Sequence, residues 1–164
     1  MNIKFVVPGA PKGKERHRSS LNKSTGKMIF YTPAQTAAYE RLIRQCYHAA
    51  AQAENRFAPA ERPLRVEIDA YFAIPKGGTK TVHSLMHENV LRPMKKPDWD
   101  NIGKIICDAL NGIAYRDDSQ IVEAVCRKYY GTFPRVEVRI SDAADKPEEK
   151  KRAVSPYGFG EAEL

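Results

Sequence analysis

The clearest periodic pattern in this sequence is an alternation of apolar and polar positions over residues 64–74. The apolar series is Leu64, Val66, Ile68, Ala70, Phe72 and Ile74. A period of two places such a series on one face of a β-strand. We therefore predict a strand here, with one face buried and the other carrying polar side chains.

Two segments carry helical signals. Thr32 followed by Pro33 is typical of a helix start, and residues 34–54 are rich in Ala, Arg, Gln and Leu. Over residues 98–113 the apolar side chains fall within an arc of about 140° on a helical wheel, opposite a polar face. We predict a helix of about five turns at the first segment and an amphipathic helix at the second. The polar face of the second helix carries Asp100, Lys104, Asp108 and Asn111.

The rest of the chain is predicted from shorter signals. Residues 3–7 form a β-like run that precedes a basic loop reaching about residue 32. Residues 75–97 have no sustained period and are expected to form a long loop with a short helical piece at 82–89. Residues 120–130 and 135–140 are expected to form a β-hairpin. The order is strand, helix, strand, helix, strand, strand.

Length and composition favour one domain followed by a tail. The chain has 164 residues, of which 42% are hydrophobic. After residue 140 the sequence holds six acidic and four basic side chains with no apolar period. We therefore expect a folded domain at residues 1–140 and a flexible C-terminal tail at residues 141–164.

The sequence carries no sign of secretion or membrane insertion. No apolar run approaches the roughly 18 residues of a membrane helix, and Pro8 and Gly9 interrupt any signal-peptide core. The cysteines Cys46, Cys107 and Cys126 are odd in number and widely spaced, which favours reduced core thiols. A cytoplasmic location is expected, with no membrane partner.

Positive charge is concentrated in the predicted domain. Residues 1–140 hold 23 basic and 14 acidic side chains, a formal net charge of +9. Such charge serves either as a solubilising surface or as a surface for nucleic acid, and its proximity to an acidic cluster favours nucleic acid. The candidate DNA contacts are Lys12, Lys14, Arg16, Arg18, Lys76, Lys80, Lys95 and Lys96.

A cluster of aspartates around residues 98–118 is the one group of residues whose side chains indicate a catalytic or metal-binding site. Asp98 and Asp100 lie at a helix start, Lys104 follows one turn later, and Asp117 and Asp118 lie in the turn after the helix. Each aspartate alone is explained by capping or turn formation. If packing brings the turn back to the helix start, however, carboxylates from both segments would offer the hard oxygen ligands that Mg²⁺ prefers. Lys104 could then reach the same phosphate.

At these residues the sequence resembles the RusA family of Holliday junction resolvases, endonucleases common in bacterial prophages and phages. The resemblance rests on the stretch from Pro97 to Lys104, the run Asp108-Ala-Leu-Asn-Gly and the run Asp117-Asp118-Ser-Gln-Ile-Val. It implies an α+β fold with a small mixed β-sheet packed against two main helices. It also implies a homodimer that resolves four-way DNA junctions by paired symmetric nicks in recombination and repair.

The resemblance further implies the roles of individual residues. The metal ligands would be Asp98, Asp100 and Asp118, with Asp117 left open as a sharer of the third position, and Lys104 would be the active-site lysine. The cofactor would be Mg²⁺, with Mn²⁺ as a substitute.

Three other interpretations compete with a Mg²⁺ nuclease. His83 and His87 have the i,i+4 spacing of zinc ligands, and Cys107 or Cys126 could complete such a site. A basic DNA-binding module without catalysis would use the acidic residues only as helix caps. A phosphatase for small molecules is disfavoured, because a domain of +9 charge with two basic loops is poorly matched to a compact substrate.

Overall fold

The computed structural model of the protein describes residues 1–16, 18–56 and 58–143. From residue 144 on, the predicted tail lies outside the described residues. The last described strand ends at Asp142, two residues beyond the boundary expected at residue 140.

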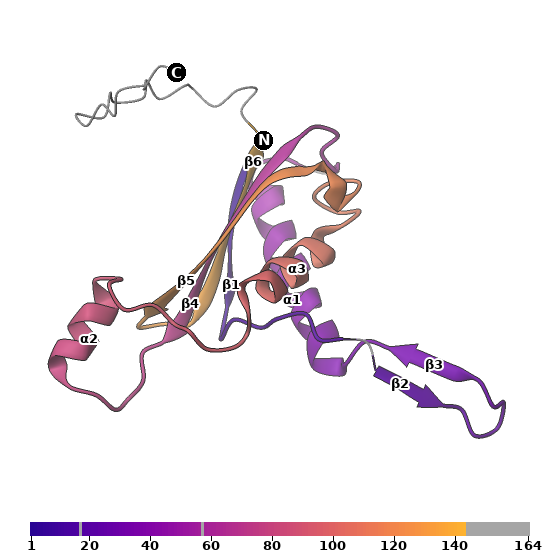
Figure 1. The fold of residues 1–164 in the computed structure, drawn as a ribbon. Helices are drawn as coiled ribbons and strands as arrows, with labels where there is room; N and C mark the ends of the chain where they lie inside the picture. Colours follow the sequence, from indigo (N-terminus) through magenta and orange to yellow (C-terminus); the bar gives the residue numbers. More distant parts are fainter. Residues whose placement is uncertain (17, 57, 144–164) are drawn as a thin grey trace, which may run out of the picture.

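A four-stranded mixed sheet forms the centre of the fold (Figure 1). Its strand order is β1-β6-β4-β5. β6 pairs antiparallel with both β1 and β4, whereas β4 and β5 are parallel. The strands are β1 (Asn2–Pro8), β4 (Leu64–Ala73), β5 (Ile121–Gly131) and β6 (Arg135–Asp142).

Two helices cover one face of this sheet, and the core lies between the two layers (Figure 1). The helix α1 (Ala34–Ala53) packs on β1 and on α3 (Trp99–Leu110), which in turn packs on β5. The alternating apolar side chains of β4 are buried, as their period of two predicts. The apolar arc of α3 is buried as well: Ile102, Ile105, Ile106, Ala109 and Leu110. The expected α+β arrangement with two main helices is confirmed.

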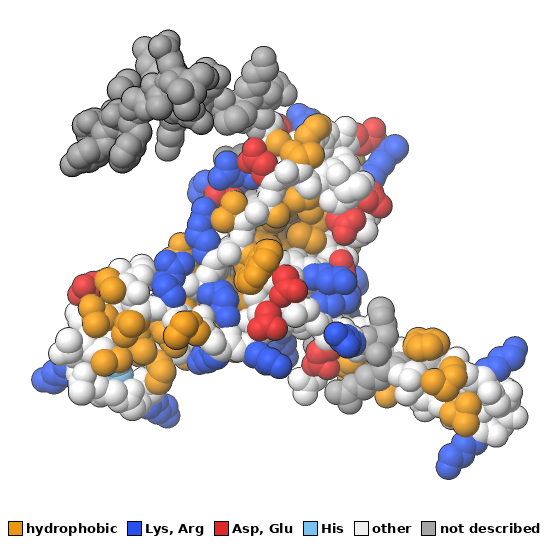
Figure 2. All heavy atoms as spheres, in the orientation of Figure 1, with side chains coloured by type: hydrophobic (Ala, Val, Ile, Leu, Met, Phe, Trp, Pro, Cys, Tyr) orange, Lys and Arg blue, Asp and Glu red, His pale blue; other side chains and the backbone are white. Residues whose placement is uncertain are grey.

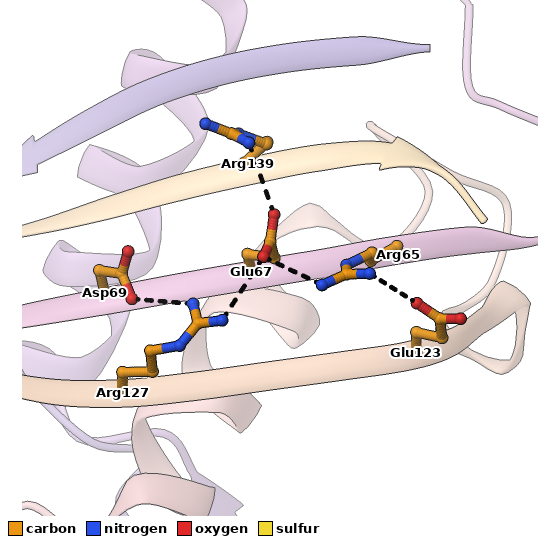
Figure 3. A network of polar contacts seen from close by, with 6 residues as sticks. All are labelled: Arg65, Glu67, Asp69, Glu123, Arg127 and Arg139. Carbon is orange, nitrogen blue, oxygen red and sulfur yellow. Dashed lines mark hydrogen bonds and ion pairs between the residues drawn. The ribbon is translucent and has the colours of Figure 1, made fainter. Parts of the chain in front are cut away.

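The polar side chains of β4 lie on the opposite face of the sheet, where they form a network of ion pairs (Figure 3). Glu67 lies 3.2 Å from Arg65, 3.6 Å from Arg127 and 3.7 Å from Arg139. Arg127 also contacts Asp69 at 3.3 Å. Partly exposed ion pairs of this kind contribute little stability each, but they account for the polar half of the alternating pattern.

The predicted hairpin between β5 and β6 is wrong, because β4 lies between these two strands. Three residues link β5 to β6, and this link can span the roughly 10 Å across two strand spacings. Gly131 begins the crossing close to β4: a Cβ at this position would lie 3.2 Å from Cδ1 of Tyr71. Proximity in sequence therefore suggested a pairing that the sheet does not contain.

Two arms project from the body of the fold (Figure 1). The segment expected to be a loop up to residue 32 contains an antiparallel ribbon of β2 (Arg18–Leu21) and β3 (Met28–Tyr31). On the other side of the molecule, the loop at residues 75–97 contains α2 (Lys80–His87), close to the helical piece expected there. Among the described residues, no helix has the length and apolar character needed to cross a membrane.

The start of α1 differs from the prediction. Pro33 rather than Thr32 occupies the N-cap position, and no side chain of the described residues caps the helix. The N–H groups of the first turn of α1 therefore have no side-chain acceptor from the described chain.

Candidate active site

The start of α3 presents two carboxylates to solvent. Asp98 is the N-cap residue of α3, but its side chain makes no capping hydrogen bond. Asp100 has one marginal contact, a 3.5 Å hydrogen bond from Asn101. Both side chains are exposed, and neither forms an ion pair with another described residue. Capping therefore does not account for Asp98, and both carboxylates remain available to a ligand.

A lysine of the sheet holds the segment that leads into α3. Lys128 of β5 donates hydrogen bonds to the carbonyl oxygens of Lys95 and Pro97, and its ammonium lies 5.2 Å from the ring centroid of Phe72. Arg92 also fastens this segment, because it donates a 2.6 Å hydrogen bond to the carbonyl of Lys128. These contacts dock the end of the long loop on β5 and place Asp98 beside it. Nothing in the sequence around Lys128 indicated this role, since a lysine in a strand commonly faces solvent.

The N-terminal basic loop packs against the other side of the α3 start. The backbone N–H of Lys14 donates to the carbonyl of Asn101 at 2.9 Å. At Gly13 the approach is so close that a Cβ would lie 2.9 Å from Cβ of Pro97 and 3.0 Å from Cβ of Asn101. Glycine is therefore needed at position 13 for the loop to reach the helix.

Lys14, an expected DNA contact, is held by two carboxylates. Its ammonium lies 2.6 Å from Glu40 of α1 and 3.0 Å from Asp108 of α3. Partial burial alone lowers the pKa of Lys14, but the hydrogen bonds and charges of Glu40 and Asp108 outweigh it and raise the pKa. This geometry gives Lys14 a structural task, the joining of the basic loop to both helices.

Lys104 lies on the exposed face of α3, one turn after Asp100. No ion pair joins it to Asp100 or to another carboxylate among the described residues, so the simple i,i+4 ion pair does not explain it. Lys104 lines a surface groove together with Arg16 and Asp108. Its ammonium therefore remains free for an anionic ligand.

The adjacent residues Asp117 and Asp118 have different surroundings. Asp117 caps the short 3₁₀ helix η1 (Asp118–Gln120), accepting a 2.8 Å hydrogen bond from the N–H of Ser119. Hydrogen bonds from Ser119 lower the pKa of Asp117. Asp118 is exposed and accepts no hydrogen bond from a backbone N–H of the described residues, and its charge helps to raise the pKa of Cys107 of α3. Asp117 is thus occupied by turn formation, whereas Asp118 is available.

The structure brings some of the predicted ligands together and leaves others apart. Asp98 caps α3 by position, and Asp100 and Lys104 lie in its first half, whereas Asp118 belongs to η1. The charge of Asp118 helps to raise the pKa of Cys107, which lies seven residues or about 10 Å further along α3 than Asp100. Among the described residues, no three His, Cys, Asp or Glu side chains form a group that could hold a metal ion. In chemistry and exposure, the Asp98 and Asp100 carboxylates still suit a hard divalent cation.

The other expected DNA contacts lie around this site or on the arms. Figure 2 shows basic and acidic side chains intermixed where α3 begins, between the two arms. Lys12 and Lys96 line a cavity with Asp98, and Lys95 lies 5.7 Å from the ring centroid of Phe72. Lys76 and Lys80 are exposed at the α2 arm, whereas the side chain of Arg18 lies outside the described part of the chain.

The residues of the competing zinc site are dispersed. His83 contacts the carbonyl of Gly77 at 3.2 Å within the α2 arm. Cys107 lies on α3 and Cys126 on β5, and burial raises the pKa of both thiols to about 11. Buried thiols with raised pKa are poor metal ligands, and they fit the reduced core thiols expected from the sequence.

Comparison with known proteins identifies relatives of the chain. A family model described as Endodeoxyribonuclease RusA matches residues 8–141, which include both sides of the site. A protein of Bacillus subtilis (strain 168), described as uncharacterized protein YqaN, is 33% identical over 145 residues. That alignment covers 87% of this chain and 97% of the relative.

Proposed function

Because the chain belongs to the RusA family of endodeoxyribonucleases, we propose that it cuts four-way DNA junctions by paired symmetric nicks, as a Mg²⁺-dependent homodimer acting in recombination and repair. Family membership supports a nuclease of the hydrolase class, and the junction as substrate, at the level of the family. The observation that carries the proposal for this chain is the pair of exposed carboxylates at the start of α3, which form no ion pair with any described residue, with Lys104 one turn away.

Two carboxylates are enough to recruit the proposed cofactor. Mg²⁺ retains several waters and is commonly bound through one or two carboxylates plus substrate phosphates. Asp98 and Asp100 would supply these carboxylates, and Asp118 rather than Asp117 is the candidate third ligand, because Asp117 is occupied as a cap. A bound divalent ion would neutralise charge on the phosphoryl oxygens and activate a water.

The remaining roles belong to the side chains themselves. Lys104, which has no carboxylate partner in the described part of the chain, would stabilise the charge that develops on the scissile phosphate. Lys128 and Gly13 would act as positioning residues, since they hold the segment before α3 and the basic loop against the carboxylates. A two-fold dimer would present two such sites to the two strands cut in a symmetric junction.

The test is a nicking assay on a synthetic four-way junction and on linear duplex, with and without Mg²⁺. We expect Mg²⁺-dependent paired nicks at the junction, and we expect Asp100→Asn to retain junction binding while losing cleavage at least about 100-fold. The matched control is Asp69→Asn, which changes a carboxylate to an amide on the opposite sheet face. If neither protein cuts while both bind the junction, the non-catalytic DNA-binding module replaces this proposal. If Asp100→Asn cuts as well as the unmodified protein, Asp100 is not part of the active site.

A further inference from the structure

A cavity of about 500 Å³ opens beside the carboxylates, between the N-terminal loop, the start of α1 and the segment before α3. Lys12 and Gly13 line it from the loop, Gln35 and Thr36 from the helix, and Lys96 from the segment before α3. Asp98 lies at its edge, shared with the candidate active site. The cavity therefore adjoins the candidate active site, but Asp100 does not line it.

Thr36 gives this cavity an unused hydrogen-bonding group. Thr36 is only 2% exposed, and its Oγ1 atom has no hydrogen-bond partner among the residues that the structure describes. A buried hydroxyl without a partner carries the cost of its lost hydration, so such groups are rare without a reason. Because Thr36 is one of the residues that line the cavity, an oxygen of a bound ligand would supply the missing partner.

The start of α1 adds a second feature that favours an anion. The helix has 20 residues, begins after Pro33 and is not capped by any described side chain. The N–H groups of its first turn have no acceptor within the helix, and the helix dipole makes this end positive. Gln35 and Thr36 belong to this first turn and line the cavity themselves. Oriented N–H donors beside a free hydroxyl form a suitable environment for phosphate oxygens.

Two lysines complete the electrostatics. Lys12 is exposed, and its ammonium lies 5.8 Å from the ring centroid of the buried Tyr39, which supports the side chain at the cavity edge. Lys96 lies across the opening. Lys14 is excluded from this role because Glu40 and Asp108 hold its ammonium. The carboxylates of Asp98 and Glu15 also line the cavity, which disfavours a small free anion and favours a phosphate held in place by a longer bound polymer.

We propose that this cavity binds one phosphodiester group of the DNA strand, next to the phosphate that is cut. The N–H groups of the first α1 turn and the Thr36 hydroxyl donate to its oxygens, and Lys12 and Lys96 balance its charge. The site would fix the register of the strand over Asp98 and Asp100. This inference rests on the proposed nuclease function, since it assigns a binding site for the substrate of that activity.

The test combines one substitution in the protein with uncharged linkages in the DNA backbone. Junctions carrying a single methylphosphonate at successive positions near the nick are bound to the unmodified protein and to Thr36→Val, which keeps the shape and removes the hydroxyl. We expect one position at which neutralisation weakens binding about 10-fold in the unmodified protein and less than about threefold in Thr36→Val. Lys12→Gln should reduce the sensitivity at the same position. The controls are Thr132→Val in the β5–β6 link and Lys4→Gln on β1. Both should leave the methylphosphonate sensitivity at that position unchanged.

A second measurement separates this site from the nuclease activity. In ¹⁵N-labelled protein titrated with a short duplex, the amide signals of Gln35 and Thr36 should shift in the unmodified protein and shift less in Lys12→Gln. Unchanged methylphosphonate sensitivity in Thr36→Val, or static amide signals, overturns the phosphate site even if the junction is cut. Shifted amide signals with no junction cleavage would support the site and overturn the nuclease proposal instead. If Thr36→Val fails to fold, the Lys12→Gln comparison and the amide shifts decide alone.

Discussion

Neighbouring side chains of the same type have different tasks in this protein. Asp117 accepts the N–H of Ser119, and its own N–H is bound by the side chain of Gln120, which also donates to the carbonyls of Ala60 and Arg62. Asp118, the next residue, is exposed, and no backbone N–H of the described residues donates to its side chain. One aspartate thus builds the turn, and the other is left for chemistry.

We predict that substitution of Asp117 affects stability, whereas substitution of Asp118 affects cleavage. Asp117→Ala should lower the free energy of unfolding by about 1 kcal/mol, the usual cost of losing a cap. Asp118→Asn should leave stability within about 0.5 kcal/mol but reduce junction cleavage at least about 10-fold. Urea unfolding and a nicking assay measure both quantities. Full cleavage by Asp118→Asn would remove this residue from the site.

The types of side chain at the site were predictable, but their partners were not. Asp98, Asp100 and Lys104 stand out because charged residues cluster at one helix start. The engagement of Lys14 by Glu40 and Asp108 joins residues 26 and 94 positions apart, and no local pattern encodes such contacts. Thr36 was equally invisible, because a threonine on the buried side of a helix commonly bonds to the backbone.

The N-terminal loop approaches the start of α3 closely beside the candidate site. This approach depends on Gly13 for space and on Lys14 for attachment to both helices. A loop that carries the basic side chains is thereby fixed beside the carboxylates. The short segment that contains Gly13 and Lys14 therefore sets how close the basic side chains of the loop lie to the carboxylates.

Gly13→Ala tests this coupling. The new methyl group would lie 2.9 Å from Cβ of Pro97, so the loop must move away from α3. We expect a loss of about 1–3 kcal/mol in unfolding free energy together with weaker cleavage. The control is Gly103→Ala within α3, where a Cβ meets nothing within 4 Å and should stabilise the helix by about 0.5–1 kcal/mol. A Gly13→Ala protein as stable as the unmodified one would show that the approach is not tight.

The contribution of Lys14 should depend on pH in a defined direction. Because its pKa is raised in the folded state, its stabilisation is complete below the unfolded pKa of about 10.4 and is lost as pH rises through the folded value. Lys14→Met should therefore be less stable than the unmodified protein by about 1–3 kcal/mol at pH 7, with the gap narrowing above about pH 10.5. Thermal unfolding across pH 7–11 checks this. The control Lys4→Met, at an exposed position of β1, should be as stable as the unmodified protein at every pH. A loss of stability in Lys14→Met that does not change with pH would contradict the prediction.

Secondary structure with strong periodicity was predictable, whereas pairing was not. The buried arcs of β4 and α3 follow from their periods. The β2–β3 ribbon escaped detection because its apolar side chains are not buried: Phe30 is 71% exposed and Leu21 is 56% exposed. The insertion of β4 between β5 and β6 could not be read from their sequences, because the short link fits either arrangement.

The protein as a unit presents its positive charge on a branched shape. The candidate site lies on the body, between the ribbon of β2 and β3 and the arm that holds α2 (Figures 1 and 2). A substrate with several arms of its own could contact the body and both projections at once. The proposed substrate, a four-way junction, has this form, whereas a straight duplex would meet fewer of these surfaces.

Binding to the junction should therefore depend steeply on salt. We expect the logarithm of the binding constant to fall linearly with the logarithm of salt concentration, and Lys12→Gln and Lys96→Gln each to reduce the slope by about 1. Lys4→Gln, on the face of the sheet opposite the helices, should leave the slope unchanged. Fluorescence anisotropy with a labelled junction gives these slopes. If the slopes of Lys12→Gln and Lys96→Gln equal that of the unmodified protein, these two lysines do not contact phosphates.

The pairing of β1 has a consequence for how the protein is made. Among the described strands, β1 pairs with β6 alone, with Asn2 opposite Ser141 and Pro8 opposite Arg135. During synthesis on the ribosome, β1 emerges long before β6, so the backbone hydrogen-bonding groups of β1 lack their sheet partner until residues 135–142 have been made. A nascent chain released before residue 135 would hold a strand without its partner, so premature termination should yield aggregation rather than a smaller working nuclease.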